Sequence, residues 1–300
     1  MNKVILRKIY GALIRFSLRL FPFWTKSKFL QKCFFYSIEM YFPNIKNPSR
    51  IREVIFRNKI KMRPLLSKYI DKHKVKSVID EINDKSSLSI KYAETIAIYS
   101  DPKDIDFNLI KESCYIKATH GSHMQIFFEP NITNKNFVIS EAGKWLNIDY
   151  SKISGEMNYT GVEKNILLER PVCEVKDRLD FYDIKIHCTN GTPIMIQILQ
   201  ENKGILNRVT YDSKWRKREW FKNECLFIDL SEILKHKIIE YAKYLSTDFD
   251  YVRIDFFLCG SELYFAEFTF SPAAAHIPLI NGAVDRELYK IYLTAKGENL

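Results

Sequence analysis

The stretch YVRIDFFLCGSELYFAEFTF, residues 251–270, decides the fold of the C-terminal third of the chain. Polar and apolar residues alternate along it, as they do along a β-strand with one buried face. Gly260 and its polar neighbours interrupt this alternation, which indicates a turn. The pattern therefore predicts a β-hairpin.

The alternation assigns the side chains of the hairpin to faces. On the first strand, one face is expected to carry Tyr251, Arg253, Asp255 and Phe257. On the second strand, one face is expected to carry Leu263, Phe265, Glu267 and Thr269. A three-residue loop, 260–262, then sets Asp255 opposite Glu267 and Arg253 opposite Thr269.

Two carboxylates that face each other need an explanation. Like charges directly across a sheet are destabilising, and carboxylates among Phe, Tyr and Ile are costly to desolvate. A shared divalent cation removes both penalties, and Mg²⁺ uses one or two carboxylates together with phosphate oxygens. The alternative is a solvated face on which the two acids pair with Arg253 and a lysine. The hairpin alone leaves both interpretations open.

The overall composition sets broad limits on the fold and the partners of the whole chain. The 300 residues allow one large domain or two to three small lobes, and the formal charge of +10 suits an anionic partner without choosing among nucleotide, sugar, nucleic acid and membrane. No C-x-x-C pair occurs, so the cysteines are expected to be reduced and mostly buried, as in a cytosolic protein. They are Cys33, Cys114, Cys173, Cys188, Cys225 and Cys259.

The first 24 residues are apolar and basic. Arg15 and Arg19 interrupt them, so no uncharged run reaches a signal-peptide core or the ~20 residues of a membrane span. As a helix ended by Pro22, the segment places Lys8 on the same side as these arginines. It either rests on anionic lipid or packs on the protein body with a basic outer stripe.

The remaining pattern indicates an α+β protein with mostly antiparallel strands. Helices are expected over 71–84 and 231–245, the second with Ser231 as N-cap and with Ile233, Ile238, Tyr241 and Leu245 on its apolar side. The Asn-Gly pair at 190–191 predicts a second hairpin. Short strands are expected at TIAIYS (95–100), CYIKAT (114–119), QIFF (125–128) and FVIS (137–140), with a short helix over 141–146.

Several polar residues stand out without being decisive. Lys117 precedes a small-residue loop that can hold phosphate, although the Walker pattern is absent. Glu169, before Arg170 and Pro171, suits a hinge strand. Two D-x-D triplets, 104–106 and 248–250, match a short metal pattern of nucleotide-sugar enzymes, which arises often by chance.

The order of these pieces resembles the TupA-like ATP-grasp family of cell-surface polysaccharide biosynthesis. The resemblance spans roughly residues 65–275, and its specificity comes from seven segments in one order. They are DKHKVK (71–76), SDPKDIDF (100–107), KATHGSH (117–123), LLER (167–170), DIKIHCTNG (183–191), VRID (252–255) and EFTFSP (267–272).

The resemblance implies an ATP site. Lys76 and Lys117 stand at the positions of phosphate-contacting basic residues, and the loop residues His120, Gly121 and Ser122 follow the second of them. Glu169 would mark the strand whose backbone holds adenine. Asp183 and Lys185 would lie near the ribose or the phosphates.

The resemblance also implies a Mg²⁺ site on the hairpin. Asp255 and Glu267 would hold the ion, with Thr269 where many ATP-grasp enzymes place an asparagine ligand. Arg253 would neutralise the transferring phosphate, and Lys185 is grouped with it as a candidate catalytic residue.

Two departures from the family pattern concern glycine. The H-G-S-G loop of the family ends here in His123, and its glycine run after F-x-P is Ala273-Ala274-Ala275-His276. Glycine permits positive φ and close backbone approach, which alanine and histidine restrict. The phosphate loop and the acceptor pocket are therefore the places where this chain is expected to differ.

The implied fold is α+β ATP-grasp, with the nucleotide held between two antiparallel-sheet lobes. A helical N-terminal region over residues 1–65 would precede an ATP-grasp region over 66–300, with a small lobe at about 95–168 and a large lobe at about 169–300.

The implied activity is ATP-dependent carboxylate–amine ligation through an acyl phosphate. It would join a uronic-acid sugar to an amino acid or amine in capsule or lipopolysaccharide synthesis, with ATP and Mg²⁺ as cofactors and no nucleic acid partner. The protein would be cytoplasmic, and its basic N-terminal helix would allow contact with the inner membrane face. Two alternatives are a glycosyltransferase-like nucleotide-sugar enzyme and a non-catalytic binding module of a polysaccharide assembly complex.

Overall fold

The computed structural model describes residues 12–13, 24–61, 63–173, 181–202, 204–222, 224 and 228–298. Residues 12 and 13 are helical, and residues 1–11 and 14–23 of the basic N-terminal segment lie outside the described residues. None of the helices in the described ranges is long and apolar enough to cross a membrane.

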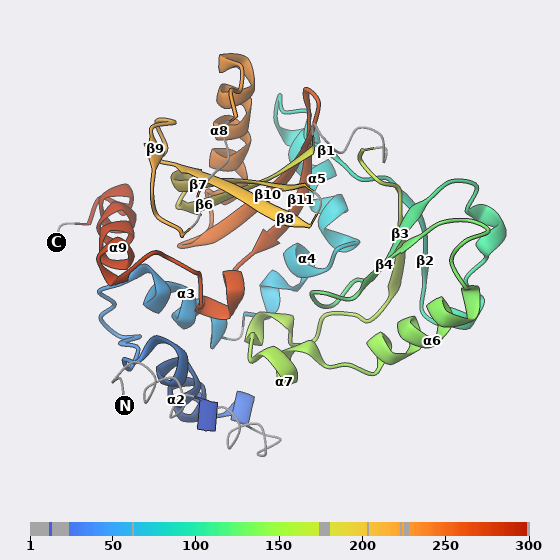
Figure 1. Ribbon diagram of the computed structural model, residues 1–300, viewed down its shortest axis with the longest axis horizontal. Coiled ribbons are helices and arrows are strands. Elements are labelled where there is room, and N and C mark those ends of the chain that lie inside the picture. Colours follow the sequence, from blue (N-terminus) through green and yellow to red (C-terminus); the bar gives the residue numbers. More distant parts are fainter. Residues whose placement is uncertain are drawn as a thin grey trace.

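Two sheets organise the chain (Figure 1). The seven-stranded sheet, in the order β1-β11-β10-β6-β7-β8-β9, is antiparallel except where β1 runs parallel to β11. Its strands are β1 (Lys91–Tyr92), β6 (Phe181–Thr189), β7 (Thr192–Asn202), β8 (Ile205–Tyr211), β9 (Lys217–Arg218), β10 (Val252–Cys259) and β11 (Glu262–Thr269). The four-stranded antiparallel sheet, in the order β2-β5-β3-β4, comprises β2 (Thr95–Tyr99), β3 (Cys114–Ala118), β4 (Gln125–Phe128) and β5 (Ile166–Glu169).

Helices surround these sheets, and 3-10 turns connect them. The α-helices of the described part are α2 (Lys28–Glu39), α3 (Ile51–Lys59), α4 (Ser67–Ile70), α5 (Lys74–Lys85), α6 (Lys135–Leu146), α7 (Tyr150–Ser154), α8 (Glu232–Ser246) and α9 (Gly282–Lys296). The 3-10 helices are η1 (Trp24–Lys26), η2 (Pro64–Leu66), η3 (Pro102–Asp104), η4 (Phe107–Leu109), η5 (Met157–Tyr159) and η7 (Pro272–Ala275). In Figure 1, α6 lies beside the four-stranded sheet, and α2, α3 and α9 lie at the opposite side of the molecule.

Three apolar clusters hold the layers together. One packs α5 and α8 against one face of the seven-stranded sheet, where Ile184, Ile186, Ile254 and Phe256 are fully buried. The second joins α3 and α9, and the third packs α6 on the four-stranded sheet. The opposite face of β6 and β10 is thereby left to carry the charged side chains.

The predicted Asn-Gly hairpin is confirmed. Asn190 and Gly191 connect β6 to β7 with φ of 44° and 74°, the left-handed values of a two-residue hairpin turn. The helix predicted over 231–245 is also present as α8, with the hydroxyl of Ser231 accepting a hydrogen bond from the Leu234 amide. Ile233 does not join its buried side, because this side chain is 84% exposed.

The predicted β10–β11 hairpin forms, and Asp255 pairs with Glu267 and Arg253 with Thr269 as expected. The three-residue loop is wrong, however, because Cys259 pairs with Glu262 across a two-residue turn. A β-bulge at Ala266 supplies the missing residue, since Phe256 pairs with Phe265 while Asp255 pairs with Glu267.

The bulge also corrects the predicted faces of β11. Leu263 and Phe265 point into the core, together with Phe268, and do not share a face with Glu267 and Thr269. One extra residue exchanges the inward and outward positions of a strand, so the charged end of β11 faces the site while the apolar end faces the core.

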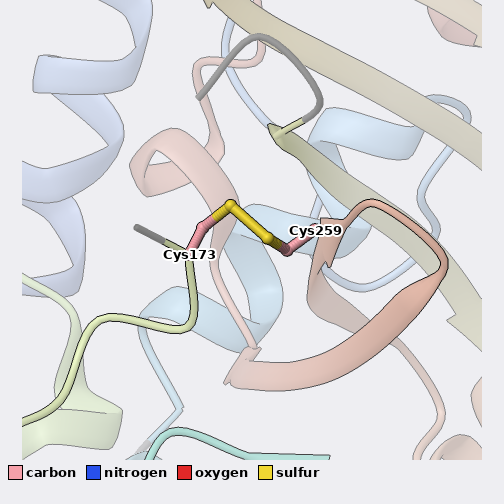
Figure 2. Close-up of a disulfide and its surroundings, with 2 residues drawn as sticks. All are labelled: Cys173 and Cys259. Carbon is pink, nitrogen blue, oxygen red and sulfur yellow. A yellow bond between two sulfur atoms is a disulfide. The ribbon is translucent and has the colours of Figure 1, made fainter. Parts of the chain in front are cut away.

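Two further predictions are wrong. The segment 137–140, predicted as a strand, lies inside α6, which begins after Asn134; the side chain of Asn134 accepts hydrogen bonds from the amides of residues 136 and 137. Cys173 and Cys259 form a disulfide, with Cα atoms 5.8 Å apart (Figure 2). The expectation of reduced thiols fails for this pair, because the fold brings together two cysteines that are 86 residues apart in the sequence. Cys33, Cys114 and Cys188 are free.

Candidate nucleotide and metal site

Two adjoining cavities lie between the sheets. One has a volume of about 180 Å³ and the other about 710 Å³. Their walls come from β3, β4 and β5 of the smaller sheet and from β6, β10 and β11 of the larger one. Residues shared by both walls are Ala93, Lys117, Gln125, Glu169, Asp183 and Phe257. The arrangement gives one continuous cleft, narrow at the hairpin and wider toward the disulfide.

A buried carboxylate joins two lysines in this cleft. Glu169 Oε1 lies 2.7 Å from Lys76 Nζ, and its Oε2 lies 2.5 Å from Lys117 Nζ. Lys76 also donates to the carbonyl of Ala93 and the hydroxyl of Thr95, at 2.7 and 2.8 Å. Burial opposes ionisation of Glu169, but the charges of Lys117 and Lys76 hold its pKa below its usual value. Both candidate phosphate-binding lysines are therefore positioned by one acid.

The family resemblance implied that Glu169 marks the strand whose backbone holds adenine. The structure adds a role for its side chain that no local pattern signals, because Lys76, Lys117 and Glu169 lie on three separate elements. Lys72 was also missed: it lines the narrow cavity and donates to the carbonyl of Gly121.

A chain of ion pairs crosses the polar face of β6, β10 and β11. Asp255 is almost fully buried and receives two hydrogen bonds of 2.6 Å from Arg253 and one of 3.1 Å from Lys185. Lys185 also lies 2.6 Å from Asp183 Oδ2. Burial raises the pKa of Asp183, and its Oδ1 is buried without a hydrogen-bond partner.

The charges of these side chains depend on each other. Burial disfavours ionisation of Asp255, but Arg253 and Lys185 hold its pKa below the usual range. Burial likewise disfavours the ammonium of Lys185, and Asp255 raises its pKa above the usual value. Asp255, Arg253 and Lys185 are therefore all charged near neutral pH. The spacing of charges along β6 and β10 is fixed by the register, which pairs Asp255 with Lys185.

Glu267 has the most exposed side chain among the acids that line the narrow cavity and is therefore the most accessible to a metal ion. Its side chain is 43% exposed, accepts a 2.9 Å hydrogen bond from Thr269 and lies 3.6 Å from Arg253. The described residues contain no cluster of three His, Cys, Asp or Glu side chains that could hold a metal. Two carboxylates and a hydroxyl nevertheless fit Mg²⁺, because phosphate oxygens and water complete its shell.

A second layer behind Arg253 was also missed. His187 is buried on β6 and lies 2.6 Å from the hydroxyl of Tyr251 through Nδ1 and 2.9 Å from the side chain of Gln197 through Nε2. Burial and then the charge of Arg253 lower its pKa to about 3, so His187 is neutral. His187 pairs with Arg253 across β6 and β10, and its neutral ring adds no positive charge beside the guanidinium.

The loop after Lys117 contributes backbone more than side chains. A Cβ at Gly121 would lie 2.0 Å from Met124 Cε, the end of a flexible side chain, and 3.0 Å from the Tyr150 ring, so a larger residue requires these side chains to move. Burial raises the pKa of Tyr150, and the Ser122 side chain opposes this shift. His120 is buried with Nε2 3.0 Å from the carbonyl of Trp145 and does not line either cavity.

The D-x-D triplets do not belong to the cleft. Asp106 accepts a hydrogen bond from the Asn108 amide at the start of η4, and Asp250 pairs with Arg57 and Lys296. Neither triplet lines the two cavities.

The family profile described as TupA-like ATPgrasp matches residues 53–292. The chain belongs to the TupA-like ATP-grasp family. No curated protein matches it.

Three solved structures are similar to this TupA-like chain. The D-alanine–D-alanine ligase from Bacillus anthracis complexed with ATP has 13% identity and a TM-score of 0.46, over 77% of this chain and 67% of that one. The corresponding ligase from Helicobacter pylori has 14% identity and a TM-score of 0.43, over 76% and 61%. The ATP-grasp ligase PsnB complexed with minimal precursor has 10% identity and a TM-score of 0.43, over 78% and 62%. The TupA-like chain thus spans 61–67% of the length of these structures.

At the positions where the family pattern has glycine, this TupA-like chain has other residues but a left-handed backbone. His123 has φ of 59°, and Ala273, Ala274 and Ala275 have φ of 49°, 49° and 76°. These are left-handed values, which glycine adopts freely and other residues adopt at a cost. The substitutions therefore change the side chains of the two loops while the backbone keeps the conformation that glycine favours.

Proposed function

We propose that this TupA-like protein is an ATP-dependent carboxylate–amine ligase whose nucleotide and metal site is the cleft between the two sheets. The observation that carries the proposal is the convergence of Lys76, Lys117 and Lys185 on one cleft that also contains Asp255 and Glu267, with Arg253 paired to Asp255. Such a set of cations suits a polyphosphate, and the acids suit its Mg²⁺.

In this proposal Glu267, Thr269 and Asp255 would hold Mg²⁺, which supplies charge neutralisation of the phosphates. Arg253 and Lys185 would stabilise the phosphoryl group during transfer, because Asp255 holds both cations in place and charged. Phosphoryl transfer depends mainly on positioning and electrostatics, so this set of residues is sufficient. The wide cavity, lined by Tyr115, Phe181 and Phe257, would receive the base.

The substrates are proposed from the family. A uronic-acid sugar would be phosphorylated at its carboxylate, and an amino acid or amine would displace the phosphate to form an amide. The formal charge of +10 suits an anionic acceptor in a surface polysaccharide. Work at the inner membrane face, through the basic N-terminal segment, is part of the same proposal.

Two measurements test the proposal against its alternatives. Mg²⁺-dependent thermal stabilisation by ATP supports the ligase, a preference for UDP-sugar contradicts it, and no response to either favours a binding module. A screen for ADP release with uronates paired with amino acids then identifies the substrates.

Replacement of Glu267 by Gln is the most direct test of the proposed Mg²⁺ site. This side chain is half-exposed, so the change removes a ligand charge without burying an unpaired group, whereas Asp255 is locked between two cations. ADP release is expected to fall by about 100-fold or more, as when one transition-state stabilising group is removed. Glu262→Gln on the same strand, where Glu262 pairs with Lys91, is the matched control and should keep its rate. An unchanged rate in Glu267→Gln would remove Glu267 from the site.

A further inference from the structure

The disulfide between Cys173 and Cys259 lies at the lining of the wide cavity (Figure 2). Cys173 is the last of four consecutive residues, 170–173, that line this cavity. Cys259 ends β10 on the same face of the strand as Phe257, which also lines the cavity. The bond therefore joins the segment 170–173 to a strand that forms another part of the same cavity.

The segment 170–173 begins the connection from the smaller sheet to the larger one. It follows β5 directly, and the amide of Arg170 donates a 2.9 Å hydrogen bond to the carbonyl of Glu94, next to β2. At the other end of the segment, the disulfide reaches the larger sheet, where Cys259 pairs with Phe181 of β6. The segment is therefore anchored to the smaller sheet by a hydrogen bond and to the larger sheet by a covalent bond.

Both cysteines of the bond are partly exposed. Each is half-buried, whereas the free cysteines Cys114 and Cys188 are fully buried. Exposed disulfides are the labile ones, because a thiolate must approach one of the two sulfurs. Burial raises the pKa of Cys114 to about 11 and that of Cys188 to about 12, so neither supplies a thiolate at neutral pH. Of these four cysteines, only the bonded pair is therefore placed to exchange with an external thiol.

We propose that Cys173 and Cys259 are a thiol–disulfide exchange site that controls nucleotide binding in the wide cavity. The co-reactant is a dithiol, which reducing compartments such as the cytosol supply. Its thiolate attacks one sulfur of the pair to form a mixed disulfide, and its second thiol releases that bond. The dithiol loses two electrons and two protons and becomes a disulfide, while Cys173 and Cys259 gain them and become thiols. This inference rests on the proposed function and concerns the regulation of the same site.

The oxidised protein is expected to bind nucleotide more tightly than the reduced protein. The bond holds residues 170–173 in place before the base enters, so less conformational freedom is lost on binding. Reduction releases this segment from β10. The affinity for nucleotide should then fall by about three- to tenfold, which corresponds to the cost of ordering one side chain.

The test is calorimetric titration of the full-length protein with Mg²⁺ and AMPPNP, before and after reduction by dithiothreitol. Thiol titration should show two additional free thiols after reduction. Mg²⁺ with tripolyphosphate is the matched ligand without a base. Its affinity should not change, because residues 170–173 line the wide cavity and not the narrow one. A bond with a purely structural role would change the free energy of unfolding and leave both affinities unchanged.

Two variants mimic the reduced state. Cys173→Ser and Cys259→Ser should bind AMPPNP as reduced wild type does, with or without dithiothreitol. Cys33→Ser, which removes a free thiol, is the control and should respond to reduction as wild type does. The titrations are made at a temperature at which thermal unfolding shows every variant to be folded.

The outcomes separate the exchange site from the function. Equal AMPPNP affinity in the oxidised and the reduced protein, an equal change for tripolyphosphate, or no new thiols on reduction overturns the exchange site. No binding of AMPPNP in either state overturns the proposed function, and the control of binding with it. Recovery of the original affinity after reoxidation is the result expected of a reversible site.

Discussion

At the scale of single residues, the charged side chains of this protein differ in what fixes them. Asp255 has a partner on each side, whereas Lys59 has none within the described chain, although both are almost fully buried. Burial lowers the pKa of Lys59 to about 8 from a usual value of 10.5. The protein therefore carries a buried charge that lowers its stability.

The Lys59 charge predicts a stability increase on its removal. Since the folded pKa is depressed, the unfolded chain binds the extra proton between about pH 8 and 10.5, and stability rises with pH across that window. The cost below pH 8 is about 3 kcal/mol by linkage. Lys59→Met should raise the free energy of unfolding by ~1–3 kcal/mol at pH 7 and by less at pH 10. Urea titrations at both pH values measure this, and a gain of the same size at both would contradict it.

Glu169 predicts the opposite effect. Replacement by Gln leaves two buried lysines without their shared carboxylate, which costs about 3–5 kcal/mol when a buried pair is broken. Since the folded pKa of Glu169 is depressed, its contribution is present at neutral pH and is lost as the pH falls through that pKa. Urea unfolding of Glu169→Gln and wild type should therefore differ at pH 7 and converge in acid. A constant difference would show that packing, and not charge, holds Glu169.

At the scale of elements, the hairpin β10–β11 shows how far the sequence pattern reaches. Alternation predicted both strands and the pairing of Asp255 with Glu267. It could not predict the bulge, because a two-residue turn with a bulge and a three-residue loop without one give the same pairing at that end of the hairpin. The consequence for the core, where Leu263 and Phe265 point inward, was therefore missed.

In other elements too, local sequence signals predicted structure and tertiary contacts could not be predicted. Turn and cap signals in the sequence, at Asn190-Gly191 and Ser231, predicted structure correctly because their effect is local. The segment 137–140 was predicted as a strand from four apolar-rich residues, too few to separate strand from helix once Asn134 caps α6. The Lys76–Glu169–Lys117 group could not be predicted, since the three residues meet through tertiary packing.

The turn η7 carries a prediction of its own. Ala273 is exposed and has φ of 49°, so replacement by Gly removes strain without loss of packing. Ala273→Gly should stabilise the protein by about 1 kcal/mol, the cost of a left-handed residue that is not glycine. Ala283→Gly, an exposed position in the first turn of α9, is the matched control and should destabilise by a similar amount. Thermal unfolding of both variants tests this, and a loss of stability in Ala273→Gly would refute it.

At the scale of the whole molecule, one covalent bond joins segments of different parts of the cleft. Cys173 follows β5 and lines the wide cavity, and Cys259 ends β10, the strand that carries Asp255 (Figure 2). The bond closes a sequence separation of 86 residues. A loop of that size places the disulfide among those that restrict the unfolded chain most.

Cys173→Ser is therefore expected to lower the free energy of unfolding by about 2–4 kcal/mol without reductant. In excess reductant the variant and wild type should have the same stability. Cys33→Ser, which removes a free thiol, is the control and should match wild type in both conditions. Equal stability of Cys173→Ser and wild type without reductant would mean that the bond does not form in solution.

The bulge at Ala266 has a consequence for how relatives of this chain should be aligned. Without this residue, β11 would alternate regularly and still place Glu267 and Thr269 on the face of the site. An insertion or deletion at that point therefore leaves both the apolar and the charged positions of the strand unchanged. Related sequences are expected to show a one-residue gap at position 266, and an alignment that closes the gap in the turn instead would shift Leu263 and Phe265 by one column.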